Sequence, residues 1–209
     1  MDRRAIVHAF CEECVWVRSL RTHFGELFES SDQRSALLLE VADTFFHDLN
    51  LMMIEYILLQ QCKLTDPESM GKDKDNLTTN YILALDWSDE TRGVLVEANA
   101  RLMEFREKIV DARRKLIAHL DLRARLNAVA LGEVAQAEEL AFWEHLQTFA
   151  DAAHREAIGG PFEIAATMQS GDIPSLVHAL KDSVEYQRLV DADPALLVQR
   201  YSHDRYRDA

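Results

Sequence analysis

The chain has 209 residues, of which 48% are apolar, and a formal net charge of −13 with only seven Gly and four Pro. The low Gly and Pro counts favour an all-helical globular fold, and the length allows one large domain or a domain with appended helices. The strong negative charge argues against a general nucleic-acid binder, because attraction to phosphates dominates that kind of affinity.

Two long helices are predicted in the first third of the chain. Apolar residues recur at helical spacing over residues 3–29, and Ser30-Ser31-Asp32 then ends that pattern. A second helix is predicted over residues 33–63, with Phe45, Met52 and Tyr56 among the residues of an apolar stripe. Other apolar residues, including Leu38, Phe46 and Ile57, broaden this stripe, so we expect the helix to be central to the fold.

Membrane insertion and export are not expected. The N-terminal residues lack the apolar core of a signal peptide, since His8, Glu12 and Glu13 interrupt them. The apolar run over residues 49–59 is too short to span a bilayer and carries Glu55. We therefore expect a cytoplasmic protein.

The middle of the chain is predicted to be a polar linker followed by two helices. Residues 65–76 are punctuated by Pro67 and Gly71, and we expect their charges to keep this linker out of a core. A short helix near residues 77–86 is expected to begin at Asn76 or Thr78. A long helix then opens at Ser88 and runs towards residue 111.

The remaining elements complete an all-α prediction. A helix over residues 134–157 should turn Leu140 and Trp143 inward, and glycines after it end the helix. An amphipathic helix is expected over residues 173–190. We predict an up-and-down helical bundle of four to five main helices with terminal helical extensions. Residues 1–160 form the bundle with its N-terminal helix, and residues 161–209 form a C-terminal helical extension and tail.

A basic cluster interrupts this acidic chain. Residues 101–125 contain eight Lys or Arg and four Asp or Glu, so this segment carries +4 and the rest of the chain −17, which together give −13. An acidic body with one basic segment suits a localised anion site. The alternative is that these charges merely solvate one face of a helix.

The side chains of this cluster suit phosphodiester cleavage without a metal. His119 can give and take a proton near neutral pH, and Arg113 or Arg114 offers a planar fork for phosphate oxygens. Lys115 and Arg123 lie four residues before and after His119, where they would surround a bound phosphate. RNA cleavage requires this combination of a base, an acid and cations around the reacting phosphate.

The same residues carry a family resemblance. Arg113 and His119, the latter ending Ile-Ala-His, resemble the Arg-spacer-His signature of HEPN domains (higher eukaryote and prokaryote nucleotide-binding). Upstream, Leu64-Thr65-Asp66-Pro67, Gly71-Lys72 and Asn76-Leu77-Thr78 resemble the linker of the abortive-infection (Abi-U-like) branch of that family.

This resemblance, which covers roughly residues 33–150, implies a homodimeric endoribonuclease with an RNA substrate. It implies a toxin or phage-defence role, for which a separately encoded antitoxin protein is a natural partner. Arg113 and His119 are six positions apart, about 240° around a regular helix, so a cleft shared by two chains would help them act together. Many family members follow the motif arginine with a short polar residue. Arg114 stands there in this chain, which leaves open which arginine has the family role.

Other candidates complete the site prediction. Asp48 and Glu55 share a face of the second helix and are candidates for orienting Arg113 or His119, with simple surface exposure as the alternative. Cys11-Glu-Glu-Cys14 has the spacing of half a zinc site, but no second pair follows at finger spacing. We therefore expect no metal and no cofactor. The rival to an enzyme is a non-catalytic helical module that binds a nucleotide, RNA or a partner protein.

Overall fold

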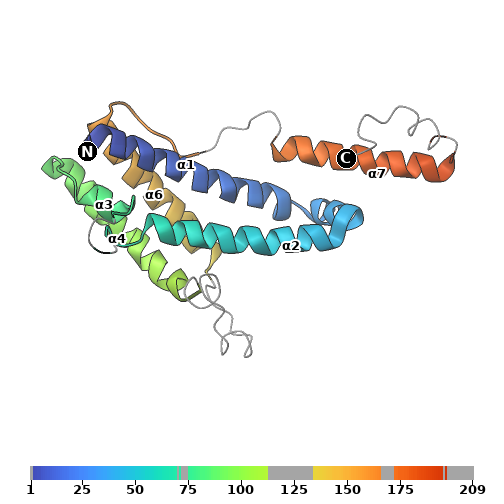
Figure 1. The fold of residues 1–209 in the computed structure, drawn as a ribbon, viewed down its shortest axis with the longest axis horizontal. Helices are drawn as coiled ribbons and strands as arrows, with labels where there is room; N and C mark the ends of the chain where they lie inside the picture. Colours follow the sequence, from blue (N-terminus) through green and yellow to red (C-terminus); the bar gives the residue numbers. More distant parts are fainter. Residues whose placement is uncertain are drawn as a thin grey trace. The chain divides into compact units, whose positions relative to one another are not determined.

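The structure is a computed structural model that describes residues 2–69, 71, 75–112, 134–165, 172–194 and 196. Within these ranges it has six helices and no strand, apart from one isolated bridge between Ser69 and Asp75 (Figure 1). The helices, with the labels of Figure 1, are α1 (Arg3–Phe28), α2 (Asp32–Leu64), α3 (Thr79–Leu83), α4 (Asp89–Ala112), α6 (Gln136–Ala157) and α7 (Ile173–Ala192). The predicted all-α bundle is confirmed.

The chain divides into two compact units. The first comprises Met1–Thr22 with Leu51–Thr167, and the second comprises His23–Asn50 with Met168–Ala209. The predicted domains, residues 1–160 and 161–209, are continuous stretches of sequence, whereas each of these units combines two stretches. The predicted domain boundary therefore stays a prediction.

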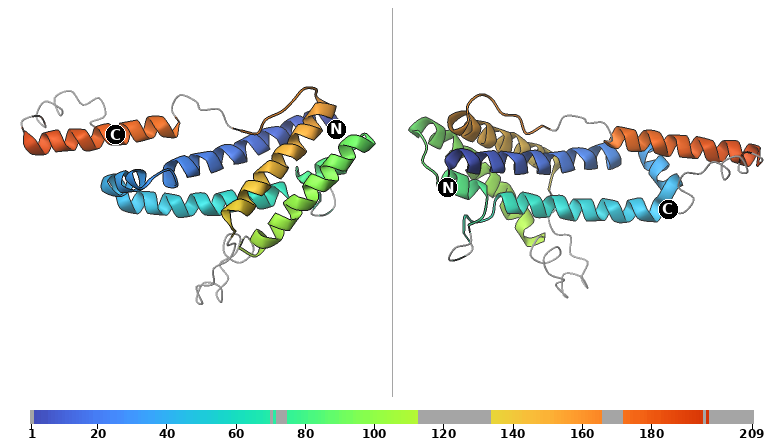
Figure 2. Two further views of the ribbon diagram at one scale, coloured as in Figure 1. Left: turned by 180° about the vertical axis from the view of Figure 1, so that it is seen from behind. Right: turned by 45° about the horizontal axis from the view of Figure 1, so that its top comes forward.

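The first unit is built around α1, α4 and α6. In it, α4 and α6 lie side by side and run in opposite directions (Figures 1 and 2). Aromatic rings fill the space between the helices: Phe105 packs on Phe142 with ring centroids 4.6 Å apart, and Phe10 meets Phe149 edge to face at 5.7 Å. All four rings are buried, and each contributes roughly 1.5–3 kcal/mol relative to an exposed position.

Local capping explains where these helices begin and end. The Thr78 hydroxyl accepts the N–H of Tyr81 at 3.2 Å, so Thr78 rather than Asn76 is the N-cap of α3. The Ser88 hydroxyl accepts the N–H of Thr91 at 3.3 Å at the start of α4. Beyond α6, Gly159 and Gly160 have φ values of 108° and 75°, a backbone region that side chains with a Cβ rarely adopt.

The second unit has a smaller apolar cluster made by Leu27, Leu38 and Phe46. Its part of α2 is interrupted at Ala42, where the backbone is non-helical. The Asp172 carboxylate accepts the N–H of Ile173 at the start of α7 and lies 2.7 Å from Nε2 of His23.

The predicted apolar stripe of α2 is wrong in part. Phe45, Met52 and Tyr56 are 58%, 55% and 42% exposed, while Leu38, Phe46 and Ile57, which broaden the predicted stripe, are buried. This helix is apolar around most of its circumference, so helical spacing alone cannot decide which side packs.

The burial predicted for α6 is partly wrong. Leu140 is 54% exposed because Phe142 takes the core position in that turn, whereas Trp143 is buried as predicted.

Candidate functional site

The five cationic and imidazole residues of the predicted site lie outside the described part of the chain. These are Arg113, Arg114, Lys115, His119 and Arg123. The structure follows the chain to Ala112 at the end of α4 and resumes at Val134, before α6. The roles assigned to these five residues therefore stay predictions.

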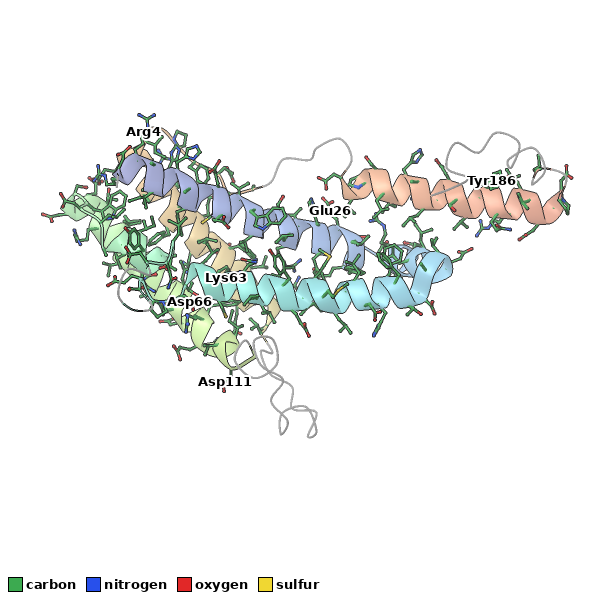
Figure 3. The ribbon with its side chains drawn as sticks, viewed as in Figure 1. Arg4, Glu26, Lys63, Asp66, Asp111 and Tyr186 are labelled. Carbon is green, nitrogen blue, oxygen red and sulfur yellow. The ribbon has the colours of Figure 1, made fainter. Side chains whose placement is uncertain are left out.

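The helices that flank this stretch are fixed to each other at the end where it begins and resumes. The Lys108 ammonium of α4 bonds the Glu138 carboxylate in the first turn of α6. This bond, together with the Ala135 N–H, lowers the pKa of Glu138 despite the opposing effect of desolvation. Asp111 lies exposed at the end of α4 (Figure 3). An ion pair thus joins α4 and α6 near the ends that flank the predicted catalytic segment.

Asp48 and Glu55, the predicted orienting acids, are both exposed on α2. Their proposed targets fall outside the described residues, so an orienting role stays a prediction. Their exposure also agrees with the alternative of two solvated carboxylates.

A buried ion pair ties the linker to α4. The guanidinium Nη2 of Arg106 lies 2.8 Å from Oδ1 of Asp66, and the two side chains are only 10% and 8% exposed (Figure 3 labels Asp66). A buried charge is stable only when it is paired and hydrogen-bonded, so this contact constrains where the linker can lie on α4.

Two asparagines extend this contact into a network. The Nδ2 of Asn80 donates to the backbone oxygen of Asp66 at 2.9 Å and to that of Thr65 at 3.3 Å. Its Oδ1 accepts from the amide of Asn99 on α4 at 3.0 Å. Asn99 and Arg106 are seven residues apart, two turns of α4, so both project from the same face of the helix.

The expectation that charges exclude the linker from the core is wrong. Thr65 and Asp66 are 0% and 6% exposed, because Arg106 and Asn80 satisfy the polar groups that burial would otherwise strand. Among the other described linker residues, Asn76 donates to the backbone oxygens of Pro67 (Nδ2, 2.9 Å) and Glu68 (N, 2.8 Å), which closes a loop at the surface.

Four buried polar atoms in the first unit have no hydrogen-bond partner within the described residues. They are Gln61 Nε2, Thr79 Oγ1, Asn99 Oδ1 and Arg106 Nε. Two of them belong to the network itself, and Thr79 is adjacent to Asn80. Ordered water commonly satisfies such atoms in native proteins, and these four are available to bind it.

The described cations of the basic segment already have partners. Arg101 bonds Glu104, Arg106 bonds Asp66 and Lys108 bonds Glu138. The positive charge left for a phosphate is therefore concentrated in residues 113–125, which hold five Lys or Arg and one acid.

The comparison with protein families decides the relationship. The family model HEPN_AbiU2, described as AbiU2, matches residues 3–172, which is most of the chain. The chain belongs to the AbiU2 family of HEPN proteins. Searches of the curated proteins and of the solved structures find no match.

For this AbiU2 chain, the linker signature has a structural explanation. The Thr-Asp-Pro residues 65–67 provide the buried Asp66 and the carbonyl that Asn76 binds, while Thr78 caps α3. Sequence reasoning identified the signature but missed Asn80, Asn99 and Arg106. Only the three-dimensional contacts reveal them: Arg106 pairs with Asp66, which lies 40 positions earlier, and Asn80 bonds Asn99. No local pattern in the sequence signals these contacts.

The two cysteines of α1 are buried thiols. Burial raises the pKa of Cys11 to about 12 and that of Cys14 well above its usual value, which favours the neutral thiol in the protein without a metal. No group of three or more possible metal ligands occurs in the described ranges.

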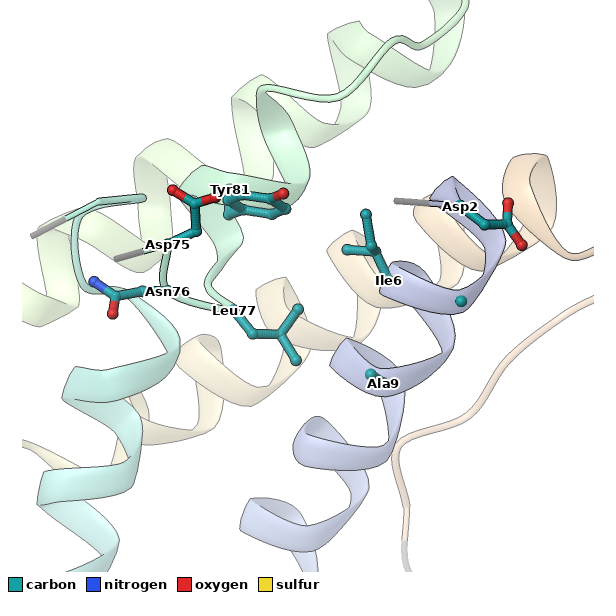
Figure 4. Close-up of a pocket in the computed structure, with 8 residues that line it drawn as sticks. Asp2, Ile6, Ala9, Asp75, Asn76, Leu77 and Tyr81 are labelled. Atoms are coloured by element: carbon teal, nitrogen blue, oxygen red, sulfur yellow. The ribbon is translucent and has the colours of Figure 1, made fainter. Parts of the chain in front are cut away.

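A hollow of about 320 Å³ opens between the start of α1 and the segment from the linker to α3. Ile6 and Ala9 face Leu77 and Tyr81 across it (Figure 4). Half of its described lining residues are aliphatic, and among these residues there is no Lys, Arg or His to bind a phosphate. None of the described helices has the length and apolar character needed to cross a membrane.

Proposed function

We propose that this AbiU2 protein is a metal-independent endoribonuclease of the HEPN type. The observation that carries the proposal is the Arg113–His119 sequence, which directly follows α4 in a chain that matches the family from residue 3 to residue 172. The surrounding acidic chain, with its positive charge concentrated in residues 113–125, supports a single anion site.

In this proposal each motif residue has a separate chemical role. Arg113 binds the scissile phosphate through two parallel hydrogen bonds and stabilises the charge that develops on it. His119 transfers the proton, as the base for the 2′-hydroxyl or the acid for the departing 5′-oxygen. Arg114, Lys115 and Arg123 contribute further positive charge around the phosphate.

One histidine per motif makes a homodimer chemically sensible. Two chains related by a two-fold axis would supply two histidines, one for each proton transfer, and two arginines for the phosphate. The cytoplasm is the proposed setting, because RNA targets and reduced thiols are both found there. As a toxin or phage-defence effector of the abortive-infection type, the nuclease would need restraint, which an antitoxin protein would provide.

The decisive experiment is cleavage of labelled transfer and messenger RNA in EDTA. We expect the wild-type protein to cut RNA and to leave cyclic-phosphate ends, and His119→Ala to abolish the cut while leaving RNA binding nearly unchanged. Arg113→Ala should weaken both cleavage and binding. His178→Ala is the matched control, because His178 is an exposed α7 histidine whose side chain is 80% accessible.

The second candidate function is a non-catalytic module that binds RNA, a nucleotide or an acidic partner through the same cations. Arg114, at a position where a short polar residue is usual in the family resemblance, favours this reading. Arg114→Asn tests it directly. If wild type is inactive but Arg114→Asn gains cleavage, the second arginine has silenced a nuclease. If neither protein cuts RNA while both bind it, the endoribonuclease proposal is wrong.

A further inference from the structure

A second groove in the first unit is lined by rings. Its volume is about 360 Å³, and it lies between one face of α1 and the end of α6. Four of its eight lining side chains carry rings: His8 and Trp16 on α1, His154 on α6 and Phe162 just beyond it. The other four are Cys11, Glu12, Val15 and Ser19.

Trp16 is the unusual member of this group. Its side chain is 49% exposed, whereas the other two tryptophans, Trp87 and Trp143, are 6% and 5% exposed. An indole left half in water beside a groove retains a large flat face for a ligand and loses little entropy when it binds one.

The opposite wall combines His154 of α6 with Phe162 in the irregular segment after it, and hydrogen bonds fix that segment. The rings of His154 and Phe162 stack with centroids 5.0 Å apart and an interplanar angle of 23°. The Phe162 N–H donates to Asp151 at 2.7 Å, and its carbonyl accepts from Gln147 at 2.6 Å. Gln147 also accepts the N–H of Ile164 at 2.8 Å. These bonds hold the rings in place before any ligand arrives, which lowers the entropic cost of binding.

The groove lies at the far end of α6 from Gln136, where the helix begins. Glu156, in the last turn of α6, accepts the Ser88 hydroxyl at 2.8 Å where α4 begins. His154 is eighteen residues along α6 from its start at Gln136, about 27 Å at the rise of an α-helix. The groove is therefore remote from the end of α6 at which the described chain resumes.

We propose that this groove binds an unpaired nucleobase. Base rings stack on aromatic side chains and imidazoles in single-stranded nucleic-acid sites through their flat faces, whereas cations in such sites bind the phosphate backbone. This matters here, because the described residues that line the groove include one carboxylate and no Lys or Arg. A ligand that depended on its phosphate would find no cation to hold it.

Glu12 gives the groove a chemical preference. Its carboxylate lies 3.3 Å from Nδ1 of His8 and is 70% exposed, so it has free capacity to accept hydrogen bonds. A carboxylate accepts N–H donors and repels bare acceptors, so guanine, with its adjacent imino and amino donors, is the best match among the common bases. Hypoxanthine, which lacks that amino group, should bind less well.

The test uses the exposed indole as its own reporter. Full-length protein carrying His119→Ala is used throughout, so that the RNA probes of the later comparison are not cleaved. It is titrated with guanosine, adenosine, uridine and inosine monophosphates, and with ribose 5-phosphate. We expect the purine nucleotides to quench tryptophan fluorescence, guanosine monophosphate most strongly, and ribose 5-phosphate to have no effect. Glu12→Gln should reduce the preference for guanosine over inosine monophosphate.

Variants then assign the signal to the groove. Trp16→Leu should remove the quench while leaving the emission of Trp87 and Trp143, and calorimetry should show affinity reduced about 5- to 150-fold, the effect of losing one stacked base. Trp16→Phe keeps a ring and should retain most of the affinity. Leu140→Ala, at another exposed apolar side chain of the same unit, is the matched control and should bind as wild type does.

The source of the base is resolved by comparing mononucleotides with short single-stranded RNA. Tighter binding of RNA that still depends on Trp16 identifies an RNA strand, whereas binding of mononucleotides alone identifies a free nucleotide. No quench by any base, an equal quench by ribose 5-phosphate, or unchanged affinity in Trp16→Leu overturns the proposal. The quench is measured in the His119→Ala protein and cleavage in the wild type, so the two proposals can fail separately. If the wild type cleaves RNA but no base quenches the fluorescence, the nucleobase proposal is wrong and the endoribonuclease proposal stands.

Discussion

The buried side of α4 has two adjoining faces that differ in chemistry. One face packs Leu102, Phe105 and Ile109 into the apolar core of the first unit, where Phe105 meets Phe142 of α6. The other presents Asn99 and Arg106 to the linker, where Asn80 and Asp66 receive them. Apolar contacts tolerate small shifts of one helix along another, because one methyl group can replace another in the packing. The Arg106 guanidinium and the Asn80–Asn99 amide pair do not tolerate such shifts, since each hydrogen-bond donor must meet its own acceptor.

This difference suggests that the two faces of α4 have different roles, a division that can be tested. The apolar face contributes most of the stability, and the polar face sets the position of α4 against the linker. That position matters because α4 leads directly to Arg113 in the sequence. The following predictions test the division, beginning with the largest expected effect.

Arg106→Met should lower the free energy of unfolding by about 3–5 kcal/mol, because it removes the guanidinium that pairs with the buried Asp66 carboxylate. Urea denaturation measures this loss. The double variant Asp66→Leu with Arg106→Met removes both charges, and it should recover most of the stability. If the double variant is no more stable than the single one, the pair contributes stability of its own, and the division proposed for α4 does not hold.

Leu146→Ala tests the apolar side, because this α6 side chain is fully buried in the core that α4 shares. The lost contacts and the remaining cavity should cost about 2–5 kcal/mol in the same measurement. No compensating second substitution is expected to rescue it, which distinguishes this face from the polar one. Leu140→Ala on the same helix, where the side chain is exposed, should change stability by less than about 0.5 kcal/mol.

Asn80→Ala should cost about 1–3 kcal/mol, because it leaves the Asn99 amide and the carbonyl of Asp66 without their partner. If the polar face mainly sets position, RNA cleavage should fall by more than this loss of stability explains. Cleavage rates measured well below the unfolding temperature, with Leu146→Ala as the comparison, separate the two effects. Equal losses of activity in both variants would argue against a positioning role.

Asp151→Asn should have the smallest effect and a characteristic dependence on pH. Desolvation raises the pKa of Asp151, but hydrogen bonds from Arg155 and from the Phe162 N–H outweigh it, so the pKa is lowered in the folded protein. The stabilisation is therefore complete above the unfolded pKa of about 3.9 and disappears as the pH falls below it. We expect the variant to lose about 0.5–1.5 kcal/mol at neutral pH and to approach wild type in acid unfolding curves below about pH 4.

Much of the fold could be predicted because its signals are local. The bounds of α1, α2 and α6 follow from apolar spacing and from flanking Ser, Asp and Gly residues, and the start of α4 follows from Ser88. The packed side of α2 could not be predicted, because Phe45 and Phe46 are equally apolar and only the tertiary contacts choose between them.

The candidate site divides in the same way. Arg113 and His119 can be identified as candidate catalytic residues from residue types and spacing alone. Both lie outside the described residues, so their geometry stays a prediction. The burial of Asp66 could not be foreseen, since a lone Asp beside a proline resembles any surface turn. Its partner Arg106 lies within a segment whose cations all resemble phosphate ligands, and only the three-dimensional contact separates it from them.

The hydrogen bond from the Asn76 N–H to the Glu68 carbonyl, together with the bridge between Ser69 and Asp75, has a practical consequence for engineering the chain. These contacts close the linker loop at its base, so the length of chain above them does not determine how Asp66 and Asn80 meet α4. Doubling such a loop costs only about 0.6 kcal/mol in closure entropy. A fluorescent label or an affinity peptide inserted after Gly71 should therefore leave the helices undisturbed, which makes this loop the natural attachment point for observing the protein at work.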